Sequence, residues 1–362
     1  EAAVVDGLDV IAVNNLREAT SFLEGITLIT PKLVNTKVLF ENQIDTEHDL
    51  NEVKGQETVK RALEIAAAGG HNLILIGPPG TGKSMLAKRL GSILPPLTLH
   101  EALETTRIHS VAGLMEPHQA LVTQRPFRAP HHTASDAGLL GGSINPSPGE
   151  ISLSHHGVLF LDELPEFRRS VLETMRQPLE EGHVTISRAA GTMTFPSEFM
   201  LVAAMNPTPD GKMPNESRSS PREIQNYLGR ISGPLLDRID LHVEVPTVNF
   251  RELEAQTGGE SSKVIRERVV EARRLQYQRW EGGPSCNARM RPRDTQKYCK
   301  MDKSTRGLLR TAMEELALSA RAYDRILKVS RTIADLAGSR TLKTEHVSEA
   351  IQYRTLDRQI WT

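Results

Sequence analysis

The sequence predicts an α/β domain followed by an all-helical domain, and three observations lead to this fold class. Three short, continuous apolar runs, "LILI" (73–76), "VLFL" (158–161) and "FMLVAA" (199–204), are each bounded by turn residues. Such runs are typical of strands that are buried on both faces of a parallel sheet. A glycine-rich turn connects the first run to a helical pattern. From about Lys263 the strand patterns stop, and apolar residues recur at helical spacing.

The composition is that of an ordinary globular protein. Of the 362 residues, 38% are apolar and 25% are charged, and this length suits two or three domains. Because the sequence begins at Glu1 without a Met, we interpret it as a fragment that lacks an N-terminal part. No signal peptide and no apolar run near the ~20 residues of a membrane span are recognisable, so we expect a cytoplasmic protein without a membrane partner. Two cysteines, Cys286 and Cys299, suggest neither a disulfide framework nor a zinc site.

The pattern divides the chain into four segments. Residues 1–30 are expected to be the end of a truncated domain, residues 31–50 a linker, residues 51–250 the α/β core and residues 260–362 the helical domain. The last segment holds 22 Lys and Arg against 13 Asp and Glu, which is compatible with nucleic-acid binding but also with a solvated helical surface. Helices are expected there at Lys263–Gln278, Thr305–Leu318, Ala320–Ala337 and Thr344–Arg354.

The glycine-rich turn "GPPGTGKS" (77–84) fits the pattern G-x-x-x-x-G-K-[ST] between a strand and a helix that begins near Lys83. This context predicts a phosphate loop, whose backbone N–H groups and helix dipole favour phosphates. Lys83 would neutralise the outer phosphates and the Ser84 hydroxyl would ligate Mg²⁺, so ATP and Mg²⁺ are the expected cofactors. The expected nucleotide-binding residues are Gly77, Pro78, Pro79, Gly80, Thr81, Gly82, Lys83, Ser84 and Met85.

An acidic pair follows the second apolar run, in "GVLFLDELPEF" (157–167). At the end of a buried strand beside a phosphate loop, Asp162 would hold the Mg²⁺ shell with Ser84. The adjacent Glu163 would polarise a water for attack on the γ-phosphorus. A solvated acidic turn is the alternative reading of the same two residues.

Asn206 ends the third apolar run. Its amide would orient the attacking water and contact the γ-phosphate. The dipeptide "NP" is also a common turn, so this role depends on the two preceding motifs.

The order of these motifs, followed by "LLDRID" and a helical lid, resembles the AAA+ ATPases, whose core is a parallel sheet sandwiched by helices. Within that class the sequence is similar to the branch that contains magnesium chelatase ATPase subunits and minichromosome maintenance helicases. It is most similar to the ComM family of magnesium chelatase-like proteins, in which residues 1–30 would be the end of a Lon-like domain. The stretches that carry this resemblance are "RPFRAPHHTASDAGLLGG" (125–142), "PGEISLSHHGVLFLDELPEF" (148–167), "SGPLLDRIDLHVEVP" (232–246) and "QYRTLDR" (352–358).

The resemblance implies two further arginine roles. Arg238, in "LLDRID", matches the arginine finger that acts in trans on the γ-phosphate of a neighbouring subunit. Arg321, in "LSARAYDR", matches the sensor-2 arginine of the lid, and Arg325, one helical turn later, is the rival for that role.

The resemblance also places two insertions. Residues 183–195, "HVTISRAAGTMTF", are predicted to form a hairpin. They match the hairpin that precedes the sensor strand in this branch and faces the pore of a hexamer. Arg188, near the hairpin tip, would contact a DNA phosphate without reading bases. Residues 141–156 match the helix-2 insert, with Asn145-Pro146-Ser147-Pro148 at its tip. The alternative for both is a structural flap that helps subunits to pack.

Two expectations concern metals. The resemblance implies four cysteines after Asn206, but residues 206–221 contain none, so we expect a mobile polar loop instead of a zinc knuckle. The histidine pairs at His131-His132 and His155-His156 are expected to pack or to form hydrogen bonds.

Together these features lead to one expected function and one alternative. The chain would be a ring-forming ATP hydrolase, a hexamer that moves single-stranded or branched DNA independently of its sequence. The resemblance implies helicase or branch-migration activity in the recombination of incoming DNA during natural transformation. The alternative is an AAA+ ATPase that remodels a protein partner, as magnesium chelatase motor subunits do.

Overall fold

The computed structural model describes residues 8–32, 48–116, 119–142, 147–188, 191–249, 259–280 and 286–354. The chain divides into two compact units. One comprises Glu1–Ile44 and Pro96–Gln124, and the other comprises Asp45–Pro95 and Arg125–Thr362. No described helix is both long enough and apolar enough to cross a bilayer.

The described residues of the first unit form two helices with well-formed N-termini. Helix α1 (Leu16–Leu23) begins after Asn15, whose side chain accepts the backbone N–H of Glu18. Helix α5 (Leu99–Val111) begins with a capping box, in which the Thr98 and Glu101 side chains each accept the other's backbone N–H. Such caps satisfy the N–H groups that a first helical turn leaves without partners.

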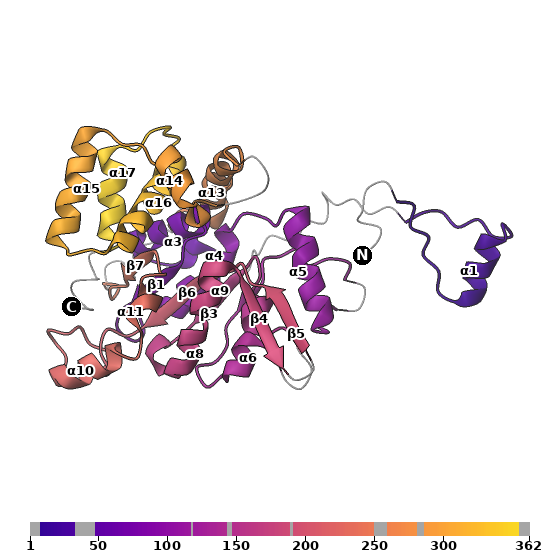
Figure 1. The fold of residues 1–362 in the computed structure, drawn as a ribbon, viewed down its shortest axis with the longest axis horizontal. Helices are drawn as coiled ribbons and strands as arrows, with labels where there is room; N and C mark the ends of the chain where they lie inside the picture. The colour runs from indigo at the N-terminus through magenta and orange to yellow at the C-terminus, as the bar shows by residue number, and fades with distance from the viewer. Residues whose placement is uncertain are drawn as a thin grey trace. The chain divides into compact units, whose positions relative to one another are not determined.

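The second unit is built on a parallel sheet of five strands in the order β2-β3-β6-β1-β7 (Figure 1). The three predicted apolar runs form its central strands, and the prediction of an α/β core with a parallel sheet is confirmed. The edge strands β2 and β7 are short or partly polar and were not expected from the sequence. The strand bounds are β1 Leu73–Ile76, β2 Phe127–Arg128, β3 Val158–Leu161, β6 Met200–Met205 and β7 Leu241–Glu244.

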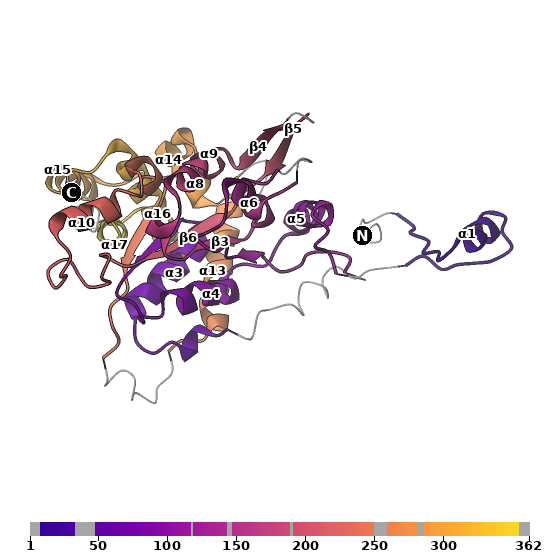
Figure 2. The same ribbon diagram turned by 90° about the horizontal axis from the view of Figure 1, so that it is seen from below.

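Alternate residues of each central strand enter two separate hydrophobic cores. In β1, Leu73 and Leu75 join the core under helices α3, α4 and α13, whereas Ile74 and Ile76 join the core on the opposite face. Figure 2 shows these helices on one face of the sheet and α6 and α8 on the other. All four side chains are at most 1% exposed, and full burial of one such side chain contributes about 1.5–3 kcal/mol. The helices on the first face are α3 Glu57–Gly69, α4 Lys83–Ile93 and α13 Ser262–Tyr277, and those on the second include α6 Asp136–Leu140, α7 Glu150–Leu153, α8 Arg169–Thr174 and α11 Gly233–Leu236.

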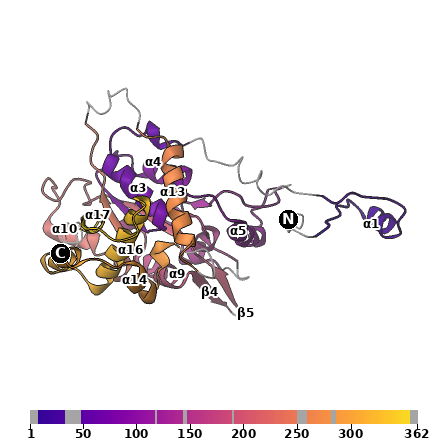
Figure 3. The ribbon, with the colours of Figure 1, turned by 90° about the horizontal axis from the view of Figure 1, so that it is seen from above.

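A two-stranded hairpin, β4 (His183–Arg188) and β5 (Gly191–Pro196), projects from the second face (Figure 3). Val184, Ile186 and Phe195 are buried and anchor it to the core. On its exposed side, hydroxyl pairs bridge the strands, Thr185 with Thr194 and Ser187 with Thr192, at 3.1 Å each. Met193 is also exposed, at 46%, and the turn residues 189–190 lie outside the described part of the chain.

The C-terminal part is helical, as the sequence predicts. Helix α16 (Ala320–Leu336) buries Ile326, Val329 and Ile333 against the first core, and Leu336 is partly buried there. The further helices are α14 Pro292–Tyr298, α15 Lys303–Glu315 and α17 Thr344–Gln352. The remaining helical elements of the second unit are η2 Leu50–Glu52, η3 Leu164–Glu166, α9 Arg176–Glu181, α10 Pro221–Leu228 and η4 Asn287–Arg289.

Candidate nucleotide site

The carboxyl ends of three neighbouring strands bring the predicted site together. The phosphate loop follows β1, Asp162 follows β3 and Asn206 follows β6, and all three strands run in the same direction. Polar groups after parallel strands therefore meet at one edge of the sheet, which is where open α/β sheets bind ligands.

The phosphate loop has a backbone that requires glycine. Gly80 and Gly82 have φ angles of +80° and +85°, which are left-handed. A Cβ on Gly77 would lie 2.3 Å from the Val245 carbonyl oxygen, whereas one on Gly80 would meet nothing within 4 Å. Helix α4 begins directly after the loop at Lys83 and has no side-chain cap. The N–H groups of its first turn are thus free of a side-chain acceptor and suited to an anion.

The Lys83 ammonium is folded back onto the loop. Its Nζ donates to the carbonyl oxygens of Gly77 and Pro78 at 2.7 and 2.8 Å and to Oδ1 of Asn206 at 3.1 Å. Burial lowers the pKa of Lys83, and the nearby Asp162 carboxylate opposes that shift. A phosphate in the loop would give this buried cation a charged partner in place of neutral carbonyls.

Ser84 and Asp162 are also brought together. The Ser84 hydroxyl donates to Oδ2 of Asp162 at 2.5 Å, and the other carboxylate oxygen accepts the backbone N–H of Glu163 at 2.9 Å. A hydroxyl and a carboxylate are hard oxygen ligands of the kind that Mg²⁺ takes beside nucleotide phosphates. With the ammonium of Lys83 and the uncapped helix, this set of donors fits ATP with Mg²⁺.

Glu163 differs from Asp162 in its contacts and lies in a more open position. It has a left-handed backbone (φ +53°), and its side chain is 58% exposed. Oε2 of Glu163 lies 3.2 Å from Nδ1 of His132, and the His132 ring contacts those of His131 and Phe167, with centroids 4.1 and 6.4 Å away. The sequence does not predict this contact with Glu163, because the pair His131-His132 belongs to no catalytic motif.

Two further residues form hydrogen bonds to the backbone of the site, and no sequence motif predicts either of them. The Gln56 amide donates to the carbonyl oxygens of Thr81 and Pro246, at 2.9 and 3.1 Å. The Tyr227 hydroxyl donates to the Asn206 carbonyl oxygen at 3.3 Å. Burial, together with nearby Glu166, raises the pKa of Tyr227 to about 12, so the phenol stays a donor at neutral pH.

The polar loop after Asn206 has an ordered centre at Asp210. This carboxylate accepts hydrogen bonds from the hydroxyls of Thr208 and Ser217, at 2.7 and 2.8 Å, and from the backbone N–H of Arg218 at 2.8 Å. These bonds lower the pKa of Asp210. A Cβ on the next residue, Gly211, would meet the Pro79 ring at 2.7 Å, so the loop that the sequence suggests to be mobile packs closely against the phosphate loop.

The candidates for the arginine finger and for sensor 2, Arg238, Arg321 and Arg325, lie at the other edge of the sheet. Arg238 precedes β7 and pairs with Glu180, and its side chain is 6% exposed. Arg321 is 63% exposed, with Nη1 3.4 Å from Oδ2 of Asp237. Arg325 pairs with a buried carboxylate, Asp240, at 3.0 Å. The structure does not bring any of the three into contact with Lys83, Asp162 or Asn206 of the same chain.

The insertion residues are described only in part. The backbone of Arg188 is paired with Gly191 at the end of the hairpin. The predicted tip of the other insertion includes Asn145 and Pro146, which lie outside the described residues. Next to it, Gly141 and Pro148 form an isolated bridge.

The sheet order, the phosphate loop after β1 and the acidic pair after β3 define a P-loop ATPase fold of the AAA+ class. The family model "Magnesium chelatase, subunit ChlI" matches residues 49–253, and the model of its C-terminal domain matches residues 259–354. The chain belongs to this magnesium chelatase-like AAA+ family and is similar to its ComM members.

Several bacterial proteins are similar in sequence to this chain. The chain is 48% identical over 312 residues to "Uncharacterized protein YifB" of Salmonella typhimurium, which covers 86% of this chain and 61% of that protein. It is 46% identical to "Competence protein ComM" of Haemophilus influenzae, over 99% of this chain and 70% of the relative. A more distant relative is "Magnesium-chelatase 67 kDa subunit" of Heliobacterium mobile, 25% identical over 53% of this chain and 30% of the relative. The chain thus spans less than two thirds of the YifB relative.

Proposed function

We propose that the chain hydrolyses ATP with Mg²⁺ at the carboxyl edge of the sheet. In this proposal Lys83 holds the outer phosphates, and Ser84 and Asp162 hold the metal ion, which would neutralise charge on the phosphates. Glu163 accepts the proton of the attacking water, and Asn206 orients that water. The proposal rests mainly on one observation, the hydrogen bond of Ser84 with Asp162. The hydrogen bond of Lys83 with Asn206 lies in the same site and supports it.

The proposal includes an assembled ring, a hexamer. Residues 51–250 act as the ATPase core and residues 260–362 as its lid. Arg238 reaches the nucleotide of a neighbouring subunit, and Arg321 reports the nucleotide state to the lid. In the described structure Arg238 pairs with Glu180 and does not contact Lys83, Asp162 or Asn206 of its own chain, which is compatible with its action on a neighbouring subunit.

The motor acts on DNA in this proposal. Hydrolysis moves the β4–β5 hairpin, and Arg188 contacts a phosphate of single-stranded or branched DNA without regard to sequence. Support comes from the exposed hydroxyls along the hairpin and from the relative that is named a competence protein. The specific role would be helicase or branch-migration activity on incoming DNA during natural transformation.

ATP turnover with and without single-stranded and forked DNA tests this function, for the native chain and for Arg188→Ala. We expect DNA to stimulate the native chain severalfold, and the variant to lose that response while it keeps its basal rate. Arg310→Ala, which removes an exposed arginine of helix α15, is the matched control. If DNA changes nothing in an assembled chain, a protein-remodelling ATPase, the alternative suggested by the chelatase relatives, becomes the better function.

A further inference from the structure

A buried carboxylate lies two residues after Arg238. Asp240 is 1% exposed. Its Oδ2 accepts the backbone N–H of Asn72 at 3.0 Å and lies 3.3 Å from Nδ1 of His71, and its Oδ1 lies 3.0 Å from Nη1 of Arg325. Burial alone would raise the pKa of Asp240, but Arg325 and His71 hold it below its ordinary value. The carboxylate is therefore charged and depends on these partners.

The partners come from two parts of the second unit. His71 and Asn72 directly precede strand β1, whereas Arg325 is on helix α16. A second contact links the same parts, because Nε2 of His71 lies 2.7 Å from the Thr332 hydroxyl, also on α16. Asp240 and His71 thus connect the α/β core to the helical part through buried polar contacts.

The same contacts determine where the backbone of Arg238 lies. The Asn72 side chain donates to the Arg238 carbonyl oxygen at 2.9 Å, and the Asn72 carbonyl accepts the N–H of Asp240 at 3.0 Å. The residue that binds the Asp240 carboxylate therefore also binds Arg238. A displacement of Asp240 changes both hydrogen bonds to this arginine's segment.

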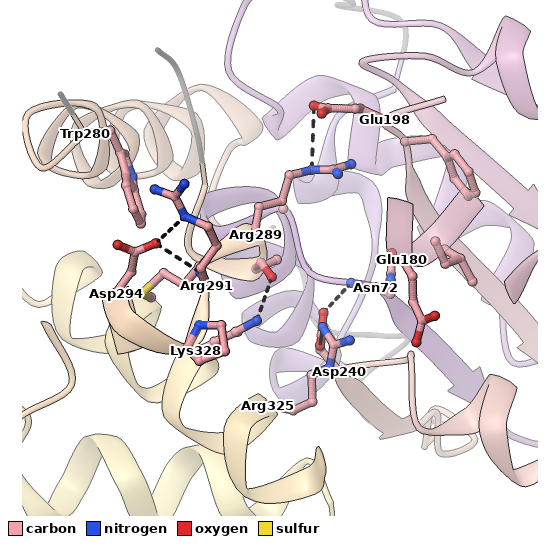
Figure 4. A pocket seen from close by; sticks show the side chains of 16 residues that line it. Asn72, Glu180, Glu198, Asp240, Trp280, Arg289, Arg291, Asp294, Arg325 and Lys328 are labelled. Carbon is pink, nitrogen blue, oxygen red and sulfur yellow. Dashed lines mark hydrogen bonds and ion pairs between the residues drawn. The ribbon is translucent and has the colours of Figure 1, made fainter. Parts of the chain in front are cut away.

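Next to this cluster is a cavity of about 630 Å³ between the core and the helical part. Figure 4 shows Glu180 and Asp240 on one side of it, with Arg325 of α16 beside Asp240, and Lys328 of the same helix on the other side. Charged groups that line it are already paired, for example Arg291 with Asp294 at 3.0 Å. Such pairing does not favour a charged ligand, and the cavity leaves space beside Arg325 and Lys328 of α16.

We propose that Asp240 is a positioning residue that couples helix α16 to Arg238. A shift of α16 moves Arg325, and the carboxylate of Asp240 follows its partner because an unpaired buried charge is costly. Through Asn72 that movement changes the placement of Arg238 at the neighbouring subunit's γ-phosphate. This inference rests on the proposed function, in which Arg238 acts in trans.

Mixed assemblies of two inactive chains supply the test. Lys83→Ala removes turnover but keeps Arg238, and Arg238→Ala keeps the phosphate loop but offers no arginine. If Arg238 acts in trans, mixing the two restores turnover at interfaces where the first chain donates to the second. No recovery would overturn the trans role of Arg238 and, with it, the coupling.

Asp240→Asn is then added to one chain of the mixture at a time. Asparagine keeps the shape of the side chain but loses the charge that pairs with Arg325. On the donor chain, Lys83→Ala, we expect the recovered kcat to fall about tenfold with KM for ATP unchanged. On the acceptor chain, Arg238→Ala, we expect recovery within about twofold of the mixture without the change. An equal loss on both chains, or no loss on the donor, would contradict the coupling.

Arg325→Gln keeps the test valid if Asp240→Asn fails to fold. Its side chain is 21% exposed, and the glutamine amide can still donate to the Asp240 carboxylate. Because this change removes the charge that pairs with Asp240, thermal unfolding checks the fold of each variant. On the donor chain it should reproduce the loss, and Arg325→Lys should restore part of the turnover. Arg310→Gln, in an exposed pair with Glu314, is the matched control. A loss equal for Arg310→Gln and Arg325→Gln would overturn the proposal.

Discussion

The two edges of the central sheet hold charged side chains in different ways. At the carboxyl edge, Glu163 is 58% exposed and Lys83 rests on neutral carbonyl oxygens. At the amino edge, the side chains of His71 and Asp240 are 0% and 1% exposed, and they contact each other and other buried groups. The first edge can rearrange around a ligand, because its charged groups have partners that are easily exchanged. At the second edge a charged group and its partner must move together, because a buried charge loses more when its partner leaves.

The difference predicts at which edge a substitution lowers stability in addition to any effect on turnover. Substitutions at the carboxyl edge should change turnover and leave the free energy of unfolding nearly constant. Substitutions at the amino edge should change the free energy of unfolding. Four predictions test this separation.

The largest expected effect is on turnover, for Glu163→Gln. Loss of the base should lower kcat about 10³-fold, since a positioned general base contributes 10²- to 10⁴-fold. ATP binding and the midpoint of thermal unfolding should not change. Steady-state ATPase assays and nucleotide titration measure the two effects. Glu166→Gln, which removes an exposed acid paired with Arg230, is the control, and normal turnover in Glu163→Gln would rule out this residue as the base.

The second prediction concerns stability at the amino edge. Asp240→Ala leaves Arg325 and the N–H of Asn72 without their buried partner, so the free energy of unfolding should fall by about 3 kcal/mol. Urea denaturation measures it. Asp237→Ala removes a more exposed carboxylate that pairs with Arg321 and should cost about 0.5 kcal/mol. Equal costs for the two variants would remove the distinction between the edges.

The sequence predicts the strands and the glycine-rich loop of the carboxyl edge because these parts follow strong local patterns. Apolar runs mark β1, β3 and β6, and residues at their ends must converge in a parallel sheet. The phosphate loop adds a glycine pattern that the left-handed φ angles of Gly80 and Gly82 explain. Strand β2, Phe127–Arg128, has only two residues, too few to show any periodicity.

The amino edge could not be predicted in this way. His71 and Asp240 are single polar residues beside strands, and they are 169 positions apart in the sequence. Their contact exists only after β1 and β7 have paired. The contact of His132 with Glu163 has the same origin, since neither residue belongs to a pattern that includes the other.

The third prediction uses the pH dependence of stability at the amino edge. Burial lowers the pKa of His71, although Asp240 opposes the shift. In the unfolded chain the imidazole takes up a proton near pH 6.5, whereas in the folded chain it does so only at lower pH. The free energy of unfolding should therefore fall as pH drops below about 6.5, by at most about 1.4 kcal/mol per pH unit from this group. Urea denaturation from pH 7.5 to 5.5 should show a smaller slope for His71→Gln; an unchanged slope would contradict the role of His71.

The smallest expected effect is that of His132→Ala at the carboxyl edge. A contact between partly exposed groups contributes up to about 1 kcal/mol, so kcat should fall at most about fivefold as Glu163 loses its orientation. KM for ATP should stay constant, because His132 does not contact the phosphate loop in the described structure. His132→Gln, which can still donate to the carboxylate, should recover most of kcat. A hundredfold loss of kcat would instead mean that Glu163 depends on its partner as strongly as Asp240 does. The two edges would then differ only in the exposure of their charged side chains.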